Sequence, residues 1–360
     1  MSDAAANMGS AGPSTPGIVA VTMGDAAGVG PELCLELLAL KEFPEHTVPL
    51  VMGNVAVLRQ VAERTGRTFD AQVLDAIPEH LDAPAVFDVS DTFKGTTVTP
   101  GRSQAACGAA AARFIEAAVQ ACRSGRCAAM VTAPISKKAL NLAGIDFPGH
   151  TEMIASLTGA PDIAMLLYSE KIAVTFVTAH QSLRSVPDSI TLERVCRVAT
   201  LMNQNLRILR DGKPPRLAVL GLNPHAGEEG LFGDEEIRIV KPAVQRLQSL
   251  GLQVEGPLPP DTAFTRDALA RFDGHVALYH DQGSIPFKMF AFDTGVNVTL
   301  GLEIIRTSPD HGTAYDIAWK GQARTDSFMS AYRLAARLAA ARHRLPGDAR
   351  TSGKRLAQNA

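Results

Sequence analysis

The chain has 360 residues, of which 46% are hydrophobic and 20% are charged, and its formal net charge is -2 at pH 7. This is the composition of a globular protein with room for two domains of ordinary size. The near balance of charge gives no bulk attraction for nucleic acid. We therefore expect no nucleic-acid partner, and any specificity for phosphate or carboxylate must come from local groups.

Cysteine usage and the N-terminal residues bear on the compartment. The five cysteines form no Cys-x-x-Cys pair, and no apolar stretch approaches the length that crosses a bilayer. The first 16 residues lack the basic start and the apolar core of a signal peptide. We expect a cytoplasmic protein with reduced thiols, no membrane partner, and flexible tails over residues 1–16 and 346–360.

Strand-like and helix-like segments alternate along the chain. In order, the apolar patterns predict a strand at 17–22, a helix from about Pro31, a strand at 48–53, helices at 54–66 and 103–122, strands at 128–135 and 172–179, a helix from about Thr191, a strand at 216–223, a helix from about Asp234, strands at 275–280 and 297–301, and a closing helix at 325–345. Strands that alternate with helices at this spacing predict βαβ units in a largely parallel sheet, which is an α/β fold.

A glycine-containing loop, MGDAAGVGPE (23–32), follows the first predicted strand and opens a helix. Its Gly-x-x-x-Gly-x-Gly spacing differs from the fingerprint of a Rossmann fold, so we do not expect that fold. Glycines let the backbone approach a ligand, and a helix start favours anions. A tight strand-to-helix turn needs the same residues, and both interpretations stay open.

Three histidines each follow a predicted strand, namely His180, His225 and His280. Ligands bind at the carboxyl ends of the strands in open α/β sheets, so three imidazoles at one edge would form a facial site for a divalent metal. Asn223 and Asp281 are candidates to orient these imidazoles, although Asp281 could equally cap a helix. A hydrogen-bonded structural role is the common alternative for any single histidine at such a place.

Two further segments carry groups that suit an anion. His150 and Thr151 lie at an apparent helix start, where a hydroxyl and backbone amides can hold a carboxylate, although a local structural role fits His150 equally well. Lys288, Asn297 and Arg306 are spaced along a later segment. A lysine and an arginine that flank a site would bind an anionic substrate, whereas elsewhere they would be surface cations.

A final loop places His311, Gly312 and Thr313 before a predicted short helix. It could pack against the adenine and ribose of a ligand, or it could only turn the chain.

Together these segments resemble the 4-hydroxythreonine-4-phosphate dehydrogenase family of vitamin B6 biosynthesis. The shared motifs run in family order over about residues 17–340, and they are MGDAAGVGPE, TAPISKKALNLAGIDFPGHTE, GLNPHAGEEGLFGDEE, GPLPPDTAF, YHDQGSIPFK, GVNVTLG and IRTSPDHGTAYDIA. The resemblance implies an isocitrate/isopropylmalate dehydrogenase-like fold with two α/β/α domains and a central cleft. It implies a first domain made of 17–130 and about 291–345, and a second domain, 131–290, that carries the metal ligands and the interface of a homodimer.

The resemblance also implies a role for individual residues. The ligands of one divalent metal (Zn, Mg or Co), at a dimer interface that uses both subunits, match His180, His225 and His280. The contacts to a small anionic, phosphorylated substrate match His150, Thr151, Lys288, Asn297 and Arg306. NAD or NADP is the implied cofactor, and its adenosine-binding segment matches His311, Gly312, Thr313 and Ala314. The candidates for the proton acceptor are Lys288 and Asp281.

The implied reaction is the metal-dependent, NAD(P)-linked oxidation of the C3 hydroxyl of 4-phosphooxy-L-threonine. The product is a 3-oxo acid, which loses carbon dioxide and gives 3-amino-2-oxopropyl phosphate.

Several positions depart from the family pattern and put the substrate in question. The usual residues are replaced at Ala179, Ser182, Ser284, Glu303 and Trp319. Related enzymes act on 4-phosphorylated D-threonate or erythronate, or on the cis-dihydrodiol of terephthalate. The retained Lys288, Asn297 and Arg306 favour a phosphorylated substrate. Two other classes remain as alternatives: a non-catalytic metabolite-binding protein and a metal-dependent hydrolase that does not bind nicotinamide.

Overall fold

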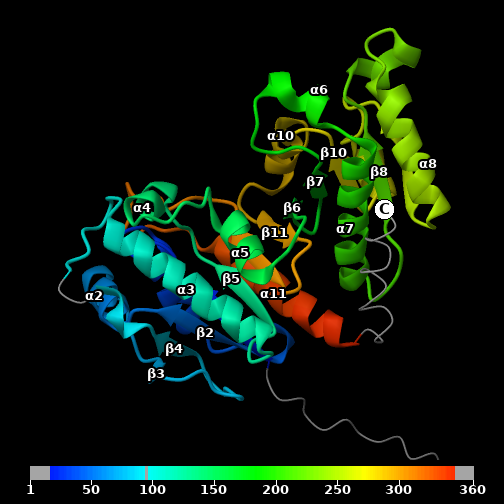
Figure 1. Cartoon of the computed structure of the whole chain (residues 1–360). Helices are drawn as coiled ribbons and strands as arrows, with labels where there is room; N and C mark the ends of the chain where they lie inside the picture. Colours follow the sequence, from blue (N-terminus) through cyan, green and yellow to red (C-terminus); the bar gives the residue numbers. More distant parts are fainter. Residues whose placement is uncertain (1–16, 94–95, 345–360) are drawn as a thin grey trace, which may run out of the picture.

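The computed structural model describes residues 17–93 and 96–344 (Figure 1). The predicted tails, 1–16 and 346–360, lie outside the described residues. One sheet runs through the described chain, and its strands, from edge to edge, are β3 (Gln72–Leu74), β4 (Ala85–Asp88), β2 (Thr47–Gly53), β1 (Gly17–Thr22), β5 (Ala129–Thr132), β12 (Arg306–Pro309), β11 (Val296–Leu300), β6 (Ala164–Tyr168), β7 (Ala173–Phe176), β10 (Gly274–Ala277), β8 (Arg216–Leu220) and β9 (Gln253–Leu258).

Helices connect most of these strands. The α-helices are α1 (Gly30–Leu38), α2 (Val55–Thr65), α3 (Ala105–Arg123), α4 (Lys137–Leu142), α5 (His150–Thr158), α6 (Val186–Ser189), α7 (Leu192–Leu209), α8 (Lys241–Ser249), α9 (Arg266–Arg271), α10 (His280–Ala291) and α11 (Asp326–Arg344). Short helical turns are η1 (Pro44–His46), η2 (Ser90–Phe93), η3 (Leu183–Ser185), η4 (Pro224–Gly230) and η5 (Glu236–Val240). Within the described ranges, no helix has both the length and the apolar character needed to span a membrane.

The α/β fold is confirmed, but the sheet is mixed at its centre. Strand β11 is antiparallel to both β12 and β6, and β6 is antiparallel to β7, whereas the other neighbours are parallel. For β6 and β7, the reason is the short link between them. Ser169 closes a tight turn there, because its Oγ accepts hydrogen bonds from the backbone N–H groups of Lys171 and Ile172. A turn of this size can join only antiparallel strands.

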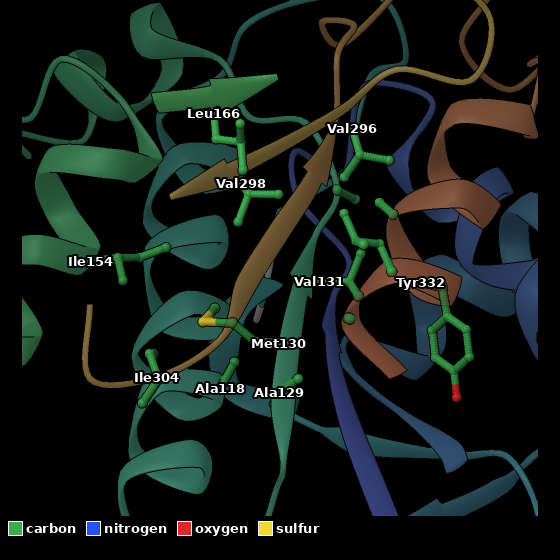
Figure 2. Packing of buried hydrophobic residues seen from close by; sticks show 14 of the residues in the cluster. Ala118, Ala129, Met130, Val131, Ile154, Leu166, Val296, Val298, Ile304 and Tyr332 are labelled. Carbon is green, nitrogen blue, oxygen red and sulfur yellow. The ribbon is translucent and has the colours of Figure 1, made fainter. Parts of the chain in front are cut away.

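The central strands lie between two long helices. Both α3 and α11 contact β1 and β5, and Figure 2 shows the strands of Val131 and Val298 between the helix of Ala118 and the helix of Tyr332. All four side chains are buried. Burial of such apolar surface contributes about 25 cal/mol per Å², so this layered core holds the sheet edge on which the candidate site is built.

The order of the strands bears on the predicted division into two domains but does not test it. Strands β1 to β5 and β12 occupy one side of the sheet and β6 to β10 the other, with β11 between them. Helices α4 and α5 pack on α3, so the segment 137–158 lies beside the first group of strands. The boundaries at about residues 130 and 290 stay a prediction.

The short helix predicted after Thr313 is wrong, because residues 315–320 form turns. Trp319 explains the difference. This residue has a left-handed φ of 62° and is 2% exposed. Its backbone N–H donates to Glu32 and its indole N–H donates to the carbonyl of Ala26. These bonds fix the turn on the glycine-containing loop, where a regular helix could not reach both partners.

Candidate functional site

Two of the three strand-end histidines lie side by side. Strand β7 pairs with β10, so the segments that follow them leave the sheet together, beside α6 and α10 (Figure 1). The ring centroids of His180 and His280 are 5.6 Å apart, and Phe176 stacks on His280 at 5.5 Å. Burial, followed by the charges of His280 and Lys137, lowers the pKa of His180. The imidazole is therefore held in the neutral form that binds metals.

Neighbouring side chains orient His280. Its Nδ1 lies 2.7 Å from Oδ1 of Asp281 and 3.2 Å from Oγ of Ser284. Because a carboxylate only accepts, Nδ1 carries the proton and the lone pair is on Nε2. The helix-cap alternative for Asp281 does not hold, since Tyr279 occupies the cap position and the hydrogen bond to His280 lowers the pKa of Asp281.

His225 lies apart from this pair. Strand β8 neighbours β10, but His225 comes five residues after Leu220, in a turn whose φ angles from His225 to Glu229 are all positive. Its Nδ1 is 2.9 Å from Oε2 of Glu228, and its side chain is exposed. Among the residues that the structure describes, no group of three or more His, Cys, Asp or Glu side chains is placed to hold a metal.

The left-handed turn around His225 is held by Glu236. This buried carboxylate accepts from the backbone N–H groups of Leu222 and Asn223, at 2.6 and 2.8 Å, and from Nδ2 of Asn223 at 3.0 Å. Each left-handed residue other than glycine costs about 1–2 kcal/mol, so these bonds are what stabilise the turn. The predicted role of Asn223 as an orienting partner of His225 is wrong, because its side chain bonds Glu235 and Glu236 instead.

Arg306 is a buried cation at the first position of β12. It is 3% exposed, and its guanidinium donates to Oγ1 of Thr132 at 2.6 and 3.1 Å and to Oγ1 of Thr299 at 3.0 Å. No carboxylate in the described part of the chain forms an ion pair with it. Burial lowers its pKa to about 10. The charge of Glu152 opposes this fall, but no carboxylate in the described part of the chain is within ion-pair distance, so this guanidinium is suited to an anionic ligand.

His150 is the first residue of α5 and lies beside Arg306. Burial, and then the charge of Arg306, lowers the pKa of His150 well below its ordinary value, although a hydrogen bond to the backbone of Ala133 opposes this. Its buried Nε2 has no hydrogen-bond partner in the described structure. Buried polar atoms are rarely left unpaired, so this atom is a place for a ligand group. Thr151, the next residue, is half-buried at the same helix start.

The remaining predicted substrate contacts lie on adjoining elements. Asn297 is in β11, which pairs with β12. Lys288 is on α10, two turns after His280, and its Nζ is 3.6 Å from Oδ2 of Asp310. Burial raises the pKa of Asp310, and the charges of Lys288, His280 and His311 oppose that rise. Sequence reasoning missed Asp310, although it directly precedes His311 in the motif SPDHGTAYDIA.

The predicted adenosine-binding segment lines a cavity of about 300 Å³. His311, Gly312 and Ala314 are in its wall, together with Val29 of the glycine-containing loop. Thr313 does not line the cavity. Its carbonyl accepts from the N–H of Val29 at 3.0 Å, and a side chain at Gly28 would collide with it. The glycine-containing loop therefore packs closely against this segment and contributes Val29 to the cavity lining.

The chain is similar to a family model, to named relatives and to solved structures over most of its length. The model of the family described as pyridoxal phosphate biosynthetic protein PdxA matches residues 45–335. A D-threonate 4-phosphate dehydrogenase from Pectobacterium atrosepticum is 43% identical and covers 89% of this chain and 99% of its own. A 4-hydroxythreonine-4-phosphate dehydrogenase from Geobacter metallireducens is 42% identical, with coverages of 91% and 97%. The crystal structure of 4-hydroxythreonine-4-phosphate dehydrogenase from Klebsiella pneumoniae superposes with a TM-score of 0.80 at 43% identity, covering 90% of this chain and 99% of that one.

Proposed function

This chain belongs to the PdxA family and is an oxidoreductase of that type, and on this premise we propose the reaction that it catalyses. The reaction is the metal-dependent oxidation of the C3 hydroxyl of 4-phosphooxy-L-threonine by NAD or NADP. The resulting 3-oxo acid loses carbon dioxide and gives 3-amino-2-oxopropyl phosphate. A second candidate substrate is 4-phospho-D-threonate, because a relative named for it is 43% identical over nearly its whole length.

The observation that carries this proposal is the buried cation Arg306 beside the unpaired Nε2 of His150. A planar guanidinium matches two oxygens of a phosphate or a carboxylate. Lys288 and Asn297 extend the polar surface on α10 and β11. A small substrate with an anionic group at each end would engage these side chains and present its central hydroxyl to His180 and His280.

The histidine pair suits a divalent metal but is incomplete in one chain. The lone pair on Nε2 of His280 and the lowered pKa of His180 fit the donor preference of Zn or Co, and catalytic sites of this kind use three protein ligands. We therefore propose that His225 of a second copy supplies the third. A metal bound there would lower the pKa of the substrate hydroxyl and stabilise the developing ketone, while the nicotinamide accepts the hydride.

Exposed apolar side chains support a homodimer at this place. Each of the three histidines is followed by large apolar residues on the surface: Leu183 (70% exposed), Leu231 (73%), Phe232 (49%), Ile285 (60%), Met289 (80%) and Phe292 (72%). Large exposed apolar side chains are typical of an interface, and we propose that these six lie in it. A two-fold axis through this surface would bring the same elements of both copies together, which is the condition for one copy to complete the metal site of the other.

The proton acceptor is assigned to Lys288. Its Nζ is within 3.6 Å of Asp310, on the helix that begins at His280, and its stem is long enough to move toward a bound substrate. Asp281 has another task, because its carboxylate is engaged by Nδ1 of His280. We assign Asp281 to the positioning of that ring.

The test is the formation of NADH or NADPH, followed at 340 nm, by the purified protein with metal supplied and then chelated. The panel contains 4-phosphooxy-L-threonine, 4-phospho-D-threonate, 4-phospho-D-erythronate and the terephthalate cis-dihydrodiol. Metal-dependent turnover that is fastest on the first compound is the expected result. Preference for the second moves the enzyme to another pathway with the same chemistry. Binding without turnover on any compound would support the metabolite-binding alternative and contradict the proposal.

A further inference from the structure

Lys137 is an exposed cation close to the residues of the candidate site, and the proposed function gives it no role. It is the first residue of α4, in the connection that leaves β5 after Thr132, the residue that accepts two hydrogen bonds from Arg306. No carboxylate in the described part of the chain lies within ion-pair distance of its Nζ. Two unpaired cations thus meet at this connection, which suits a ligand with more than one negative charge.

The side chain of Lys137 lies close to the start of α5. A Cβ on Gly149, the cap residue of that helix, would be 3.8 Å from Cε of Lys137 and 3.5 Å from Oε2 of Glu152. The charge of Lys137 also reaches His180, where it contributes to the lowered pKa of the imidazole. The side chain is therefore near both the helix start that carries His150 and the histidine pair.

A chain of hydrogen bonds fixes the start of α4. The Oγ of Ser136 caps this helix, because it accepts from the N–H of Ala139 at 3.2 Å. The Oγ atoms of Ser136 and Ser103 are 3.2 Å apart, Ser103 donates to the hydroxyl of Tyr315 at 3.3 Å, and Tyr315 donates to Oδ2 of Asp25 at 2.6 Å. Since Ser103 uses its proton on Tyr315, Ser136 is the donor between the two serines. The cation at the first position of α4 is therefore positioned before a ligand arrives.

From this arrangement we propose that Lys137 is a second substrate-binding cation, which holds the anionic group at the end of the substrate that Arg306 does not hold. This inference rests on the proposed function and adds that the substrate has an anionic group, phosphate or carboxylate, at each end. The ammonium group of a lysine is a compact charge that suits either one. The carboxylate of Glu152, which also lies near Gly149, is beyond ion-pair distance and leaves the ammonium group available.

The direct test measures substrate binding without turnover. Calorimetry would use the full-length protein with zinc supplied and without nicotinamide cofactor. Lys137→Met should weaken the binding of 4-phosphooxy-L-threonine roughly tenfold, since the lost charge pair is exposed and partly screened by salt. Lys137→Arg keeps the charge and should restore most of the affinity. Lys138→Met removes the next charge on α4, which is also exposed, and should leave the affinity as in the wild type.

A second ligand shows which end of the substrate Lys137 holds. The compound 3-amino-2-hydroxypropyl phosphate has the phosphate and the hydroxyl of 4-phosphooxy-L-threonine but lacks the carboxylate. The cation that holds the carboxylate contributes nothing to the binding of this compound. One of the variants Lys137→Met and Arg306→Met should therefore weaken its binding, and the other should not. Equal losses in both variants would place both cations on the same group and overturn the proposal.

The outcomes separate this inference from the proposed function. Unchanged affinity in Lys137→Met, in a protein that binds 4-phosphooxy-L-threonine, would overturn the role of Lys137 and leave the dehydrogenase proposal standing. An equal loss in Lys138→Met would reveal a general effect of charge and would also overturn that role. If the wild type binds 4-phospho-D-threonate alone, the choice of substrate is wrong, and the same variants on that compound decide the role of Lys137. Binding of neither compound would contradict both proposals.

Discussion

The variant Arg306→Met tests whether Arg306 binds a ligand or only stabilises the fold. The side chain is buried without a carboxylate partner, and burial lowers its pKa to about 10, against an ordinary value near 12.5. Each unit of pKa corresponds to about 1.4 kcal/mol, so the folded protein pays about 3 kcal/mol to keep this charge at neutral pH. Because the pKa of this base is lower in the folded protein than in the unfolded chain, the destabilisation is fully present below about pH 10 and is lost as the pH rises above that value.

Two consequences of Arg306→Met follow from this balance. The variant loses the burial penalty but leaves the hydroxyls of Thr132 and Thr299 without their donor, at about 1–3 kcal/mol each. The free energy of unfolding, measured with urea, should therefore rise by no more than about 1 kcal/mol or fall by no more than about 3 kcal/mol. A bound anion would relieve the penalty in the wild type, so affinity for 4-phosphooxy-L-threonine, measured by calorimetry, should fall roughly 100-fold.

Arg194 provides the matched control. Arg194 is partly buried, and its guanidinium donates hydrogen bonds to the carboxylate of Asp162 and to the backbone carbonyls of Val177 and Ile163. Arg194→Met should lower the free energy of unfolding and leave the affinity for the substrate unchanged. The reasoning is refuted if Arg306→Met behaves in the same way, with a large loss of stability and intact binding.

Three more predictions follow from other contacts. Asp281→Asn should weaken Zn binding by about 10- to 100-fold in a chelator competition, since the carboxylate holds Nδ1 of His280; unchanged affinity would remove its positioning role. Trp319→Gly relieves a φ of 62° but empties a buried site, so the melting temperature should fall, and a rise would mean that backbone strain dominates. Met289→Asp should yield monomers in analytical ultracentrifugation, whereas Leu142→Asp, at an exposed site on α4, should stay dimeric. Dimers of both variants would place the interface elsewhere.

The sequence predicts the order of most elements and the place of the histidine pair. His180 and His280 each follow an apolar run, and adjacent strands bring their rings together. Alternation cannot show strand direction, so the antiparallel β6, β7 and β11 were not predicted. Strands β5, β7, β8 and β10 end before their apolar runs do, and these runs extend beyond the sheet into the loops that carry the site.

Other features depend on contacts between distant segments. The turn of His225 takes its shape from Glu236, and no local pattern signals five consecutive residues with positive φ. The cavity beside His311 joins Asp293, which follows α10, with Arg324, which precedes α11, and the two residues meet only in the folded chain. The packing of distant segments also decides whether Arg306 forms an ion pair with a carboxylate. The motif around Arg306 does not reveal this.

Subunit complementation tests the central claim most directly. His180→Ala and His225→Ala should each abolish metal-dependent NADH formation, because each removes one proposed ligand from every site. When the two variants are mixed and allowed to exchange subunits, half of the dimers combine them, and each of these has one site with intact ligands. The account predicts a return to about one quarter of wild-type activity, the value set by the symmetry of a two-fold dimer. Exchanged dimers that remain inactive would contradict a metal site built from two copies of this chain.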